Sequence, residues 1–204
     1  MDIDPEKLVD DVFFKFPSTG QNKSELVECL KIITKIPLYN CLEIGTQYGG
    51  TFYLWQQICK GKIISIDLPN GDFGGLGLDF CIDRNSKLEK ENSFFILGDS
   101  KDSDTKRQLN KILKNEKLDL LFIDGDHSFD GTKHDFEFYS QYVNKGGFIV
   151  FHDIGNNAIN TSTSCECKKF FDSIESKTKI IIDHQTSWAP NKEIIGGIGI
   201  LQCS

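Results

Sequence analysis

Short apolar runs alternate with amphipathic helical patterns along most of this chain. The runs lie within 40–45, 62–67, 93–100, 118–124 and 147–151. Apolar runs of this length, bounded by turn residues, predict buried strands. Helical patterns follow at 51–60, 83–90, 105–115 and 132–142. Because strands that alternate with helices pair in parallel, the pattern predicts an α/β fold built on a parallel sheet.

The ends of the chain depart from this alternation. Residues 4–14 predict a helix with Asp4 as its cap and Pro5 at its first position, and a second helix begins at Ser24. These helices either pack on the core or form part of a substrate lid, and their apolar faces favour packing. After a helix over 167–176, strands at 179–183 and 194–201 are joined by too short a connection for a helical crossover, so they should pair antiparallel. We therefore expect a helical extension over 1–38 and a main domain over 39–204.

A glycine-rich turn follows the first predicted strand, in the stretch from Leu42 to Thr51. Glycine lets a ligand approach bare backbone, and the N-terminus of the next helix offers unpaired N–H groups. The dinucleotide fingerprint requires its second glycine, where the backbone meets the pyrophosphate, at the position of Gln47 in this chain. The turn therefore predicts a nucleoside ligand without a diphosphate.

The second predicted strand ends in Asp67. An acid in this place can accept hydrogen bonds from both ribose hydroxyls, although it could instead be a turn residue before Pro69. The glycine-rich stretch 70–77 that follows reads either as a lid over the ligand or as a solvent-exposed turn.

Acids and histidines gather after the fourth and fifth predicted strands. Asp124, Asp126 and His127 lie in one tight turn, and His152 and Asp153 end the next strand. Like charges this close are costly unless a cation or a shared proton relieves them. Since parallel strands end at one edge of a sheet, both groups should face the same site.

Composition narrows the class of protein. A formal charge of -7, with lysines scattered along the chain, argues against nucleic-acid binding. The sequence has no apolar run long enough to span a membrane and no basic leader, which predicts a cytoplasmic protein. Seven cysteines without a Cys-x-x-Cys pair predict reduced thiols. Cys165-x-Cys167 suggests a metal clip, but no second pair is near in sequence.

Three motifs resemble a known family. Leu42-Glu43-Ile44-Gly45 with Gly49-Gly50 is similar to the first motif of class I S-adenosylmethionine-dependent methyltransferases. The stretches 123–129 and 146–154 resemble the O-methyltransferases of the cephalosporin hydroxylase-like, macrocin and rhamnosyl group. This resemblance implies a Rossmann-like seven-stranded sheet, with five parallel strands, a C-terminal antiparallel hairpin and helices on both faces. The main domain would then be a class I methyltransferase domain.

The resemblance also implies roles for individual residues. Asp99, with Ser100, would face the adenine ring, although either could simply cap the next helix. Tyr48 would either meet the sulfonium or pack. The expected cofactor-binding set is Glu43, Gly45, Thr46, Tyr48, Gly49, Thr51, Asp67, Asp99, Ser100 and Asp124.

Activation of the methyl acceptor is expected from the acid cluster. Mg²⁺ or Mn²⁺ bound by Asp124 and Asp153 would lower the pKa of an acceptor hydroxyl, and Asp126, His127 or His152 would act as general base. Similar proteins carry a second acid where this chain has Ile154, so a site without metal is kept open. His134 and His184 are expected to be structural.

The sequence thus predicts an S-adenosylmethionine-dependent O-methyltransferase for a small hydroxylated metabolite or sugar. Alternatives are a nicotinamide-dependent oxidoreductase, an N- or protein-methyltransferase, and a catalytically inactive cofactor-binding module. The expected partner is a small-molecule substrate, recognised in part by the polar loop 155–164; a homo-oligomer is left open.

Overall fold

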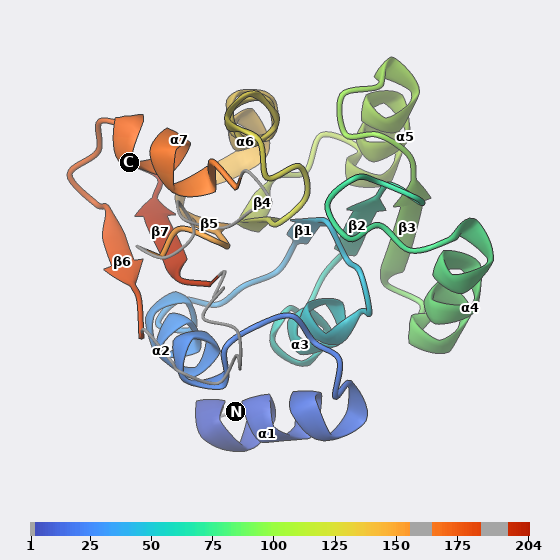
Figure 1. Cartoon of the computed structure of the whole chain (residues 1–204), viewed down its shortest axis with the longest axis horizontal. Helices are drawn as coiled ribbons and strands as arrows, with labels where there is room; N and C mark the ends of the chain where they lie inside the picture. The colour runs from blue at the N-terminus through green and yellow to red at the C-terminus, as the bar shows by residue number, and fades with distance from the viewer. Residues whose placement is uncertain (1–2, 156–164, 185–195) are drawn as a thin grey trace.

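One seven-stranded sheet forms the centre of the molecule, which we describe from a computed structural model (Figure 1). The structure describes residues 3–155, 165–184 and 196–204. The strand order is β3-β2-β1-β4-β5-β7-β6. Strands β1 to β5 pair in parallel, whereas β7 pairs antiparallel with both β5 and β6. The predicted Rossmann-like sheet with a C-terminal antiparallel pair is therefore confirmed.

The strands are short and mostly buried, as their apolar sequences require. Their bounds are β1 Cys41–Ile44, β2 Ile63–Asp67, β3 Ser93–Leu97, β4 Leu118–Ile123, β5 Val143–Phe151, β6 Ile180–Ile182 and β7 Ile198–Gln202. All residues of β1 and β2 are buried, which fits strands covered on both faces.

Helices follow the strands along the chain. Their bounds are α1 Pro5–Lys15, α2 Lys23–Ile33, α3 Gly50–Ile58, α4 Leu78–Leu88, α5 Ser103–Leu113, α6 Phe129–Tyr139 and α7 Cys167–Ser173, with a 3₁₀ turn at Ser140–Tyr142. Helix α1 begins as predicted, because the Asp4 carboxylate accepts from the first free backbone N–H groups. Among the described residues, no helix has the length and apolar character to cross a membrane.

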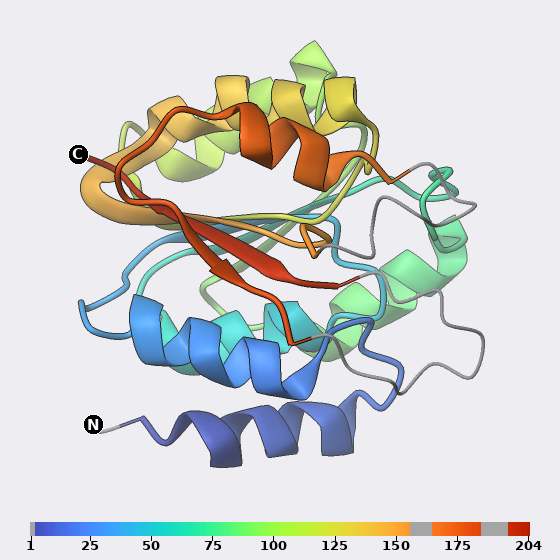
Figure 2. The same cartoon turned by 60° about the vertical axis from the view of Figure 1, so that its left-hand side comes forward.

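Successive strand residues point into two separate cores. In β4, Leu120 and Phe122 face the core under α1, α2 and α3, while Leu121 and Ile123 face the core under α5, α6 and α7. Figure 2 shows the sheet between these two layers of helices, with α1 as the outermost helix of its layer. The period of two along each strand thus produces a three-layer molecule.

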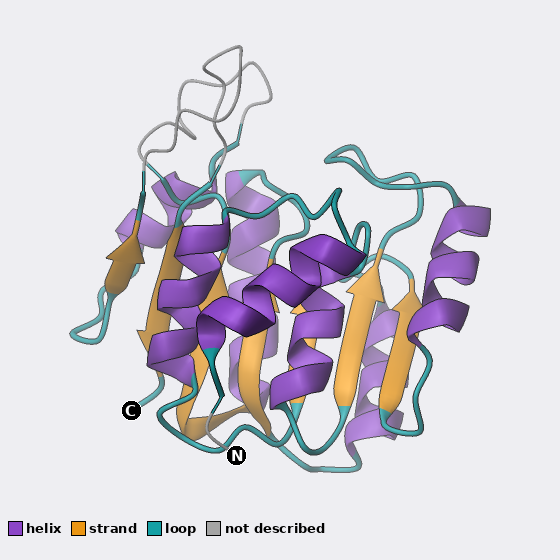
Figure 3. Cartoon of the chain, turned by 90° about the horizontal axis from the view of Figure 1, so that it is seen from below, coloured by secondary structure: helices purple, strands orange, loops and turns teal. Residues whose placement is uncertain are grey.

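The N-terminal helices are part of the hydrophobic core. Val9 and Val12 of α1, together with Leu26 of α2, are almost fully buried in the cluster that also contains Trp55 of α3. In Figure 3, α1, the first helix after the N mark, crosses in front of the helices that cover this face of the sheet. This packing supports, as a proposal, a domain description in which 1–38 extends the domain over 39–204.

Two details differ from expectation. Helix α4 begins at Leu78, five residues earlier than predicted, directly after the glycine-rich stretch. An acid on the helix predicted over 132–142 would ordinarily face solvent, but Asp135 of α6 is fully buried, where its Oδ1 accepts a 2.6 Å hydrogen bond from Ser100 Oγ. Most of the predicted substrate loop 155–164 and the connection between β6 and β7 lie outside the described residues.

Candidate active site

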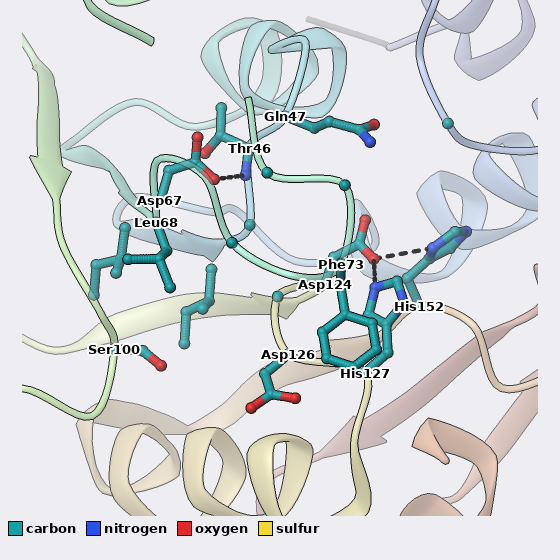
Figure 4. A pocket seen from close by; sticks show the side chains of 18 of the residues that line it. Thr46, Gln47, Asp67, Leu68, Phe73, Ser100, Asp124, Asp126, His127 and His152 are labelled. Atoms are coloured by element: carbon teal, nitrogen blue, oxygen red, sulfur yellow. Dashed lines mark hydrogen bonds and ion pairs between the residues drawn. The ribbon is translucent and has the colours of Figure 1, made fainter. Parts of the chain in front are cut away.

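A cavity of about 450 Å³ opens at the edge of the sheet where the parallel strands end (Figure 4). This volume lies in the range of small-molecule sites. Its wall comes from the turns after β1, β2, β3, β4 and β5, and from the α1–α2 connection. Asp67 and Asp124, which belong to different halves of the predicted site, line the same cavity.

The glycine turn after β1 is shaped by two positive φ angles. Gly45 has φ +86°, and a Cβ at this residue would lie 2.0 Å from the carbonyl oxygen of Asp124. Gly49 has φ +90° and caps α3 without a side chain. Glycine is therefore required where the turn passes the tip of β4, and Gly50 and Thr51, the first residues of α3, line the cavity.

Asp67 is held at the end of β2 by two neighbours. Its Oδ1 accepts from the backbone N–H of Thr46 at 3.1 Å, and its Oδ2 accepts from Arg84 Nη1 at 2.6 Å. Arg84 of α4 is 4% exposed and also donates to the carbonyl of Gln47. A buried charge pair fixes both the carboxylate and the glycine turn.

Asp124, His127, His152 and Asp153 form a compact cluster at the tips of β4 and β5. Asp124 Oδ1 lies 3.1 Å from His152 Nδ1 and 3.6 Å from His127 Nε2. His127 Nε2 lies 3.4 Å from Asp153 Oδ2. Asp153 has φ 58°, a strained value for a residue with a side chain.

The charges in this cluster stabilise one another. Burial acts to raise the pKa of Asp124, but His152 and His127 outweigh it and hold that pKa at about 2. Burial likewise opposes the His127 imidazolium, but Asp124 and Asp153 raise its pKa to about 9. Burial also disfavours the charged form of His152, yet the same two carboxylates raise its pKa well above the usual value. Without another cation, both imidazoles are protonated at neutral pH.

Asp126 lies beside this cluster but has a different partner. Its Oδ2 accepts from Lys101 Nζ at 2.6 Å. Burial acts to raise the pKa of Asp126, but Lys101 and Ser128 outweigh it, so the pKa is below the usual value. Phe73, from the glycine-rich stretch after β2, lies with its ring centroid 5.2 Å from that of His127 (Figure 4). Residues 71–75 also line the cavity, as a lid would, although the lid role stays a prediction.

The cavity brings together almost all of the predicted site residues. The lining includes Gly45, Thr46, Tyr48, Gly49, Thr51, Asp67, Asp99, Ser100, Asp124, Asp126, His127, His152 and Asp153. Glu43 is the exception and requires a correction. It is fully buried and does not line the cavity, and its Oε2 accepts a 2.6 Å hydrogen bond from Trp55 Nε1. Successive strand residues point to opposite faces, and this one points to the face that α3 covers.

Several cavity residues were not found from the sequence. Thr19, Gly20 and Gln21 of the α1–α2 connection line the wall, and Gln21 Nε2 donates to Asp124 Oδ2 at 2.8 Å. Arg84 and Lys101 were missed as well, although each pairs with a predicted site acid. The connection between the first two helices could be located from the sequence, but Gln21 and Asp124 are 103 positions apart, so their contact could not be predicted from local pattern.

The structure also places the histidines, the helix cap and the cysteines that the sequence analysis discussed. His134 contacts Lys106 and stacks on Phe138, and His184 Nδ1 lies 2.8 Å from Ser24 Oγ, so both lie outside the cavity lining. Asp102, not Asp99 or Ser100, occupies the N-cap position of α5. All seven cysteines are free thiols, as expected.

Comparison with known proteins identifies the family. Residues 42–154, more than half of the chain, match a family described as a methyltransferase domain. The chain belongs to this methyltransferase family. The resemblance to class I methyltransferases is thereby confirmed, and a nicotinamide-dependent oxidoreductase is not supported. Another relative, an uncharacterised protein of Acanthamoeba polyphaga mimivirus, is 36% identical over 121 residues, which are 55% of this chain and 50% of that protein. The chain spans about half the length of this curated relative.

Solved structures share the fold at low identity. An O-methyltransferase from Bacillus cereus in complex with SAH superposes with a TM-score of 0.63 at 17% identity, covering 98% of this chain and 91% of that one. The MycE methyltransferase of the mycinamycin pathway, in complex with Mg, SAH and mycinamycin VI, gives a TM-score of 0.61 at 15% identity, covering 98% of this chain and 54% of that one. These similarities establish the methyltransferase fold of the described chain.

Proposed function

We propose that this protein transfers a methyl group from S-adenosylmethionine to a hydroxyl of a small metabolite or sugar. The observation that carries the proposal is the shared cavity. Residues suited to a nucleoside, from the turn after β1 to Asp67 and Ser100, line the same cavity as the cluster around Asp124. Solved structures of the same fold are in complex with SAH, and one of them also holds mycinamycin VI, which supports this choice of ligands.

Different parts of the cofactor would bind at the ends of three strands, β1, β2 and β3. The turn from Gly45 to Gly49 would approach the methionyl part with bare backbone, and Asp67 would accept from the ribose. One Asp67 oxygen already accepts from Arg84, so we expect the ribose to share this carboxylate with the guanidinium. Asp99 and Ser100 would meet the adenine ring.

The reaction needs alignment and proton removal. A lone pair of the acceptor oxygen attacks the methyl carbon, the carbon–sulfur bonding electrons return to sulfur, and the hydroxyl proton leaves to a base. Alignment can contribute about 7 to 11 kcal/mol in well-oriented cases. Among the three proposed bases, His127 and His152 hold protons at neutral pH in the ion-free cluster, whereas Asp126 is a carboxylate. Asp126 is therefore the base that can accept a proton directly.

A low pKa makes Asp126 a weak base, so the acceptor itself must be made more acidic. Asp124 and Asp153 lie together with His152 in a group whose ligand atoms are within 4.8 Å of one another, and these residues fit a divalent cation. When bound, such an ion would lower the pKa of a coordinated hydroxyl. Ile154, in place of the second acid of similar proteins, is buried in the hydrophobic core and offers no ligand.

The first experiment measures ligand binding and then turnover. S-Adenosylhomocysteine should raise the melting temperature and NADH should not. Turnover of S-adenosylmethionine with catechols, sugars and macrolides should identify a hydroxyl acceptor, and EDTA should lower the rate. Methylation of an amine that EDTA leaves untouched would favour the alternative of an N- or protein-methyltransferase. Binding without turnover across all acceptors would favour an inactive cofactor-binding module.

A further inference from the structure

Two groups of ligand-type side chains meet between the tips of β4 and β5. One contains Asp124, His152 and Asp153, and the other contains His127, Asp153 and Cys165. Within each group the ligand atoms lie within 4.8 Å of one another. Asp153 belongs to both, so the two groups form one continuous cluster of carboxylates, imidazoles and a thiol.

The spacing of these atoms suits a common centre. His127 Nε2 lies 3.4 Å from Asp153 Oδ2 and 3.6 Å from Asp124 Oδ1. Nitrogen and oxygen ligands at about 2.0 to 2.2 Å from one tetrahedral ion stand roughly 3.4 Å apart. The observed separations therefore match the ligand spacing around a single ion.

Two buried atoms of the cluster lack hydrogen bonds among the described residues. They are His152 Nε2 and Asp153 Oδ1, in residues that are 4% and 3% exposed. Asp153 Oδ1 lies within the cluster, 3.2 Å from His152 Nδ1. Asp153 Oδ1 is thus already paired with a charged group, whereas His152 Nε2 has no hydrogen-bond partner among the described residues. Because buried polar atoms are nearly always satisfied, His152 Nε2 indicates a partner that the described chain does not supply.

The donor types select the class of ion. Mg²⁺ prefers six oxygen ligands, whereas imidazole and thiolate suit Zn²⁺, Fe²⁺ and Co²⁺. Cys165 is 4% exposed, and its Sγ lies 3.7 Å from the carbonyl of Asp153. The neighbouring Cys167 Sγ instead contacts Thr132 Oγ1 and the carbonyl of His127. Only the first thiol of the Cys165-x-Cys167 pair therefore belongs to the cluster.

We propose that Asp153, His127 and Cys165 bind a transition-metal ion of the Zn²⁺, Fe²⁺ and Co²⁺ class, with Asp124 and His152 beside it, in preference to Mg²⁺. This inference rests on the proposed function, because it names the ion of the same site. It replaces the Mg²⁺ or Mn²⁺ expected from the sequence with a different ion. The reason is that Mg²⁺ prefers oxygen ligands, whereas this group includes an imidazole nitrogen and a thiol sulfur. It also assigns His127 to ion binding rather than to proton transfer.

The same distances would arise in a cluster without metal, where two imidazoliums pair with two carboxylates. The two arrangements differ in the role of the thiol. Imidazolium pairs need no sulfur, whereas a metal centre that includes Cys165 places a thiolate directly on the ion. A spectroscopic signal of sulfur ligation therefore separates them.

The test is a Co²⁺ titration of the full-length, chelator-treated protein, followed by absorption and calorimetry. We expect visible ligand-field bands together with a near-ultraviolet sulfur-to-cobalt charge-transfer band, both removed by Zn²⁺ and retained in millimolar Mg²⁺. Cys165→Ser should lose the charge-transfer band, and His127→Gln should weaken Co²⁺ binding at least tenfold. Cys203→Ser removes a thiol near the opposite edge of the sheet, where Cys203 bonds Gly147, and should bind Co²⁺ like the parent.

Absence of a charge-transfer band in the parent protein, or displacement of Co²⁺ by Mg²⁺, would overturn the inference. The parent titration does not depend on how well the Cys165 variant folds. S-Adenosylhomocysteine binding, measured on the same samples, tests the proposed function separately. Cofactor binding without Co²⁺ bands rejects the ion alone, and Co²⁺ bands without cofactor binding reject the methyltransferase proposal alone.

Discussion

Asp126 shows how one neighbour sets the chemistry of a single side chain. Its carboxylate is paired with Lys101 and stays ionised at neutral pH, whereas His127 and His152 hold protons in the ion-free cluster because neighbouring carboxylates raise their pKa. Three side chains that the sequence proposes equally as general bases therefore differ in protonation state. The charge of each partner, which is a property of the fold, decides which group can accept a proton.

Replacement of Asp126 by Asn should therefore remove the proton acceptor. We expect the rate constant for methyl transfer to fall about 100-fold or more, because general bases contribute roughly 10² to 10⁴. The dissociation constant of S-adenosylhomocysteine should change little. Single-turnover kinetics and calorimetry measure the two effects, with Asp130→Asn in the exposed first turn of α6 as the control. A variant with parental turnover would show that another group accepts the proton.

Gly45 is a second position where one residue controls the site. Gly45→Ala combines a positive φ with a clash against the Asp124 carbonyl, whereas Gly146→Ala has the same sign of φ with nothing within 4 Å. We expect Gly146→Ala to cost about 1 kcal/mol in the free energy of unfolding, and Gly45→Ala at least about 2 kcal/mol more. Urea unfolding measures both; equal losses would mean that the close approach between β1 and β4 is absent in solution.

At the scale of elements, helices and the α1–α2 connection hold the cavity residues at the strand ends in place. The α1–α2 connection places Gln21 against Asp124, and α6 fixes the tip of β3 through Asp135 and Tyr139, which bond Ser100. Helix α4 likewise holds Asp67 through Arg84. Packing helices thus also orient cavity residues, so the choice between packing and lid made from the sequence was too narrow.

Gln21→Ala tests the part played by the N-terminal extension. Gln21 lines the cavity and orients Asp124 through a hydrogen bond to a charged group. Such bonds contribute roughly 1.5 to 3 kcal/mol, so without this one Asp124 is held less firmly and S-adenosylhomocysteine binding should weaken about tenfold. Gln57→Ala, on the exposed side of α3, is the matched control because it also removes one glutamine amide. Calorimetry gives both affinities. Equal affinities for the two variants would show that the extension only packs.

At the scale of the whole molecule, a buried acid links folding to pH. Burial raises the pKa of Glu43 to about 8, although Thr51, Trp55 and Thr46 oppose this. In the unfolded chain the pKa is near 4.5. The folded protein therefore holds an extra proton between these values. The stabilisation is complete below about pH 4.5 and is lost as pH rises through about 8.

Glu43→Gln should remove this dependence, because an amide carries no charge in either state. Across pH 5 to 7 the parent should lose stability on the order of 1.4 kcal/mol per pH unit relative to the variant. Urea unfolding at several pH values measures the difference and cancels the contribution of His127, which both proteins share. If the free energy of unfolding varied with pH in the same way in both proteins, Glu43 would be ionised in the folded protein.

The sequence determined the layers and most of the site. Apolar runs and helical patterns fix the α/β alternation locally, and parallel strands must end at one edge, so Asp67, Asp124 and Asp153 could be placed together without coordinates. Glu43 and Asp135 show the limit of this reasoning. Each lies on a predicted element, but its burial depends on what packs against it.

Only the tertiary structure decided which side chains meet from distant parts of the chain. Gln21 reaches Asp124, Lys101 neutralises Asp126, and Cys165 joins His127 and Asp153. Periodicity along a sequence reports which face of an element is apolar, but it carries no information on contacts between elements far apart in the chain. The fold could therefore be predicted from local sequence pattern. The charge states of the site residues and the ligand set of the cluster depend on packing between distant elements.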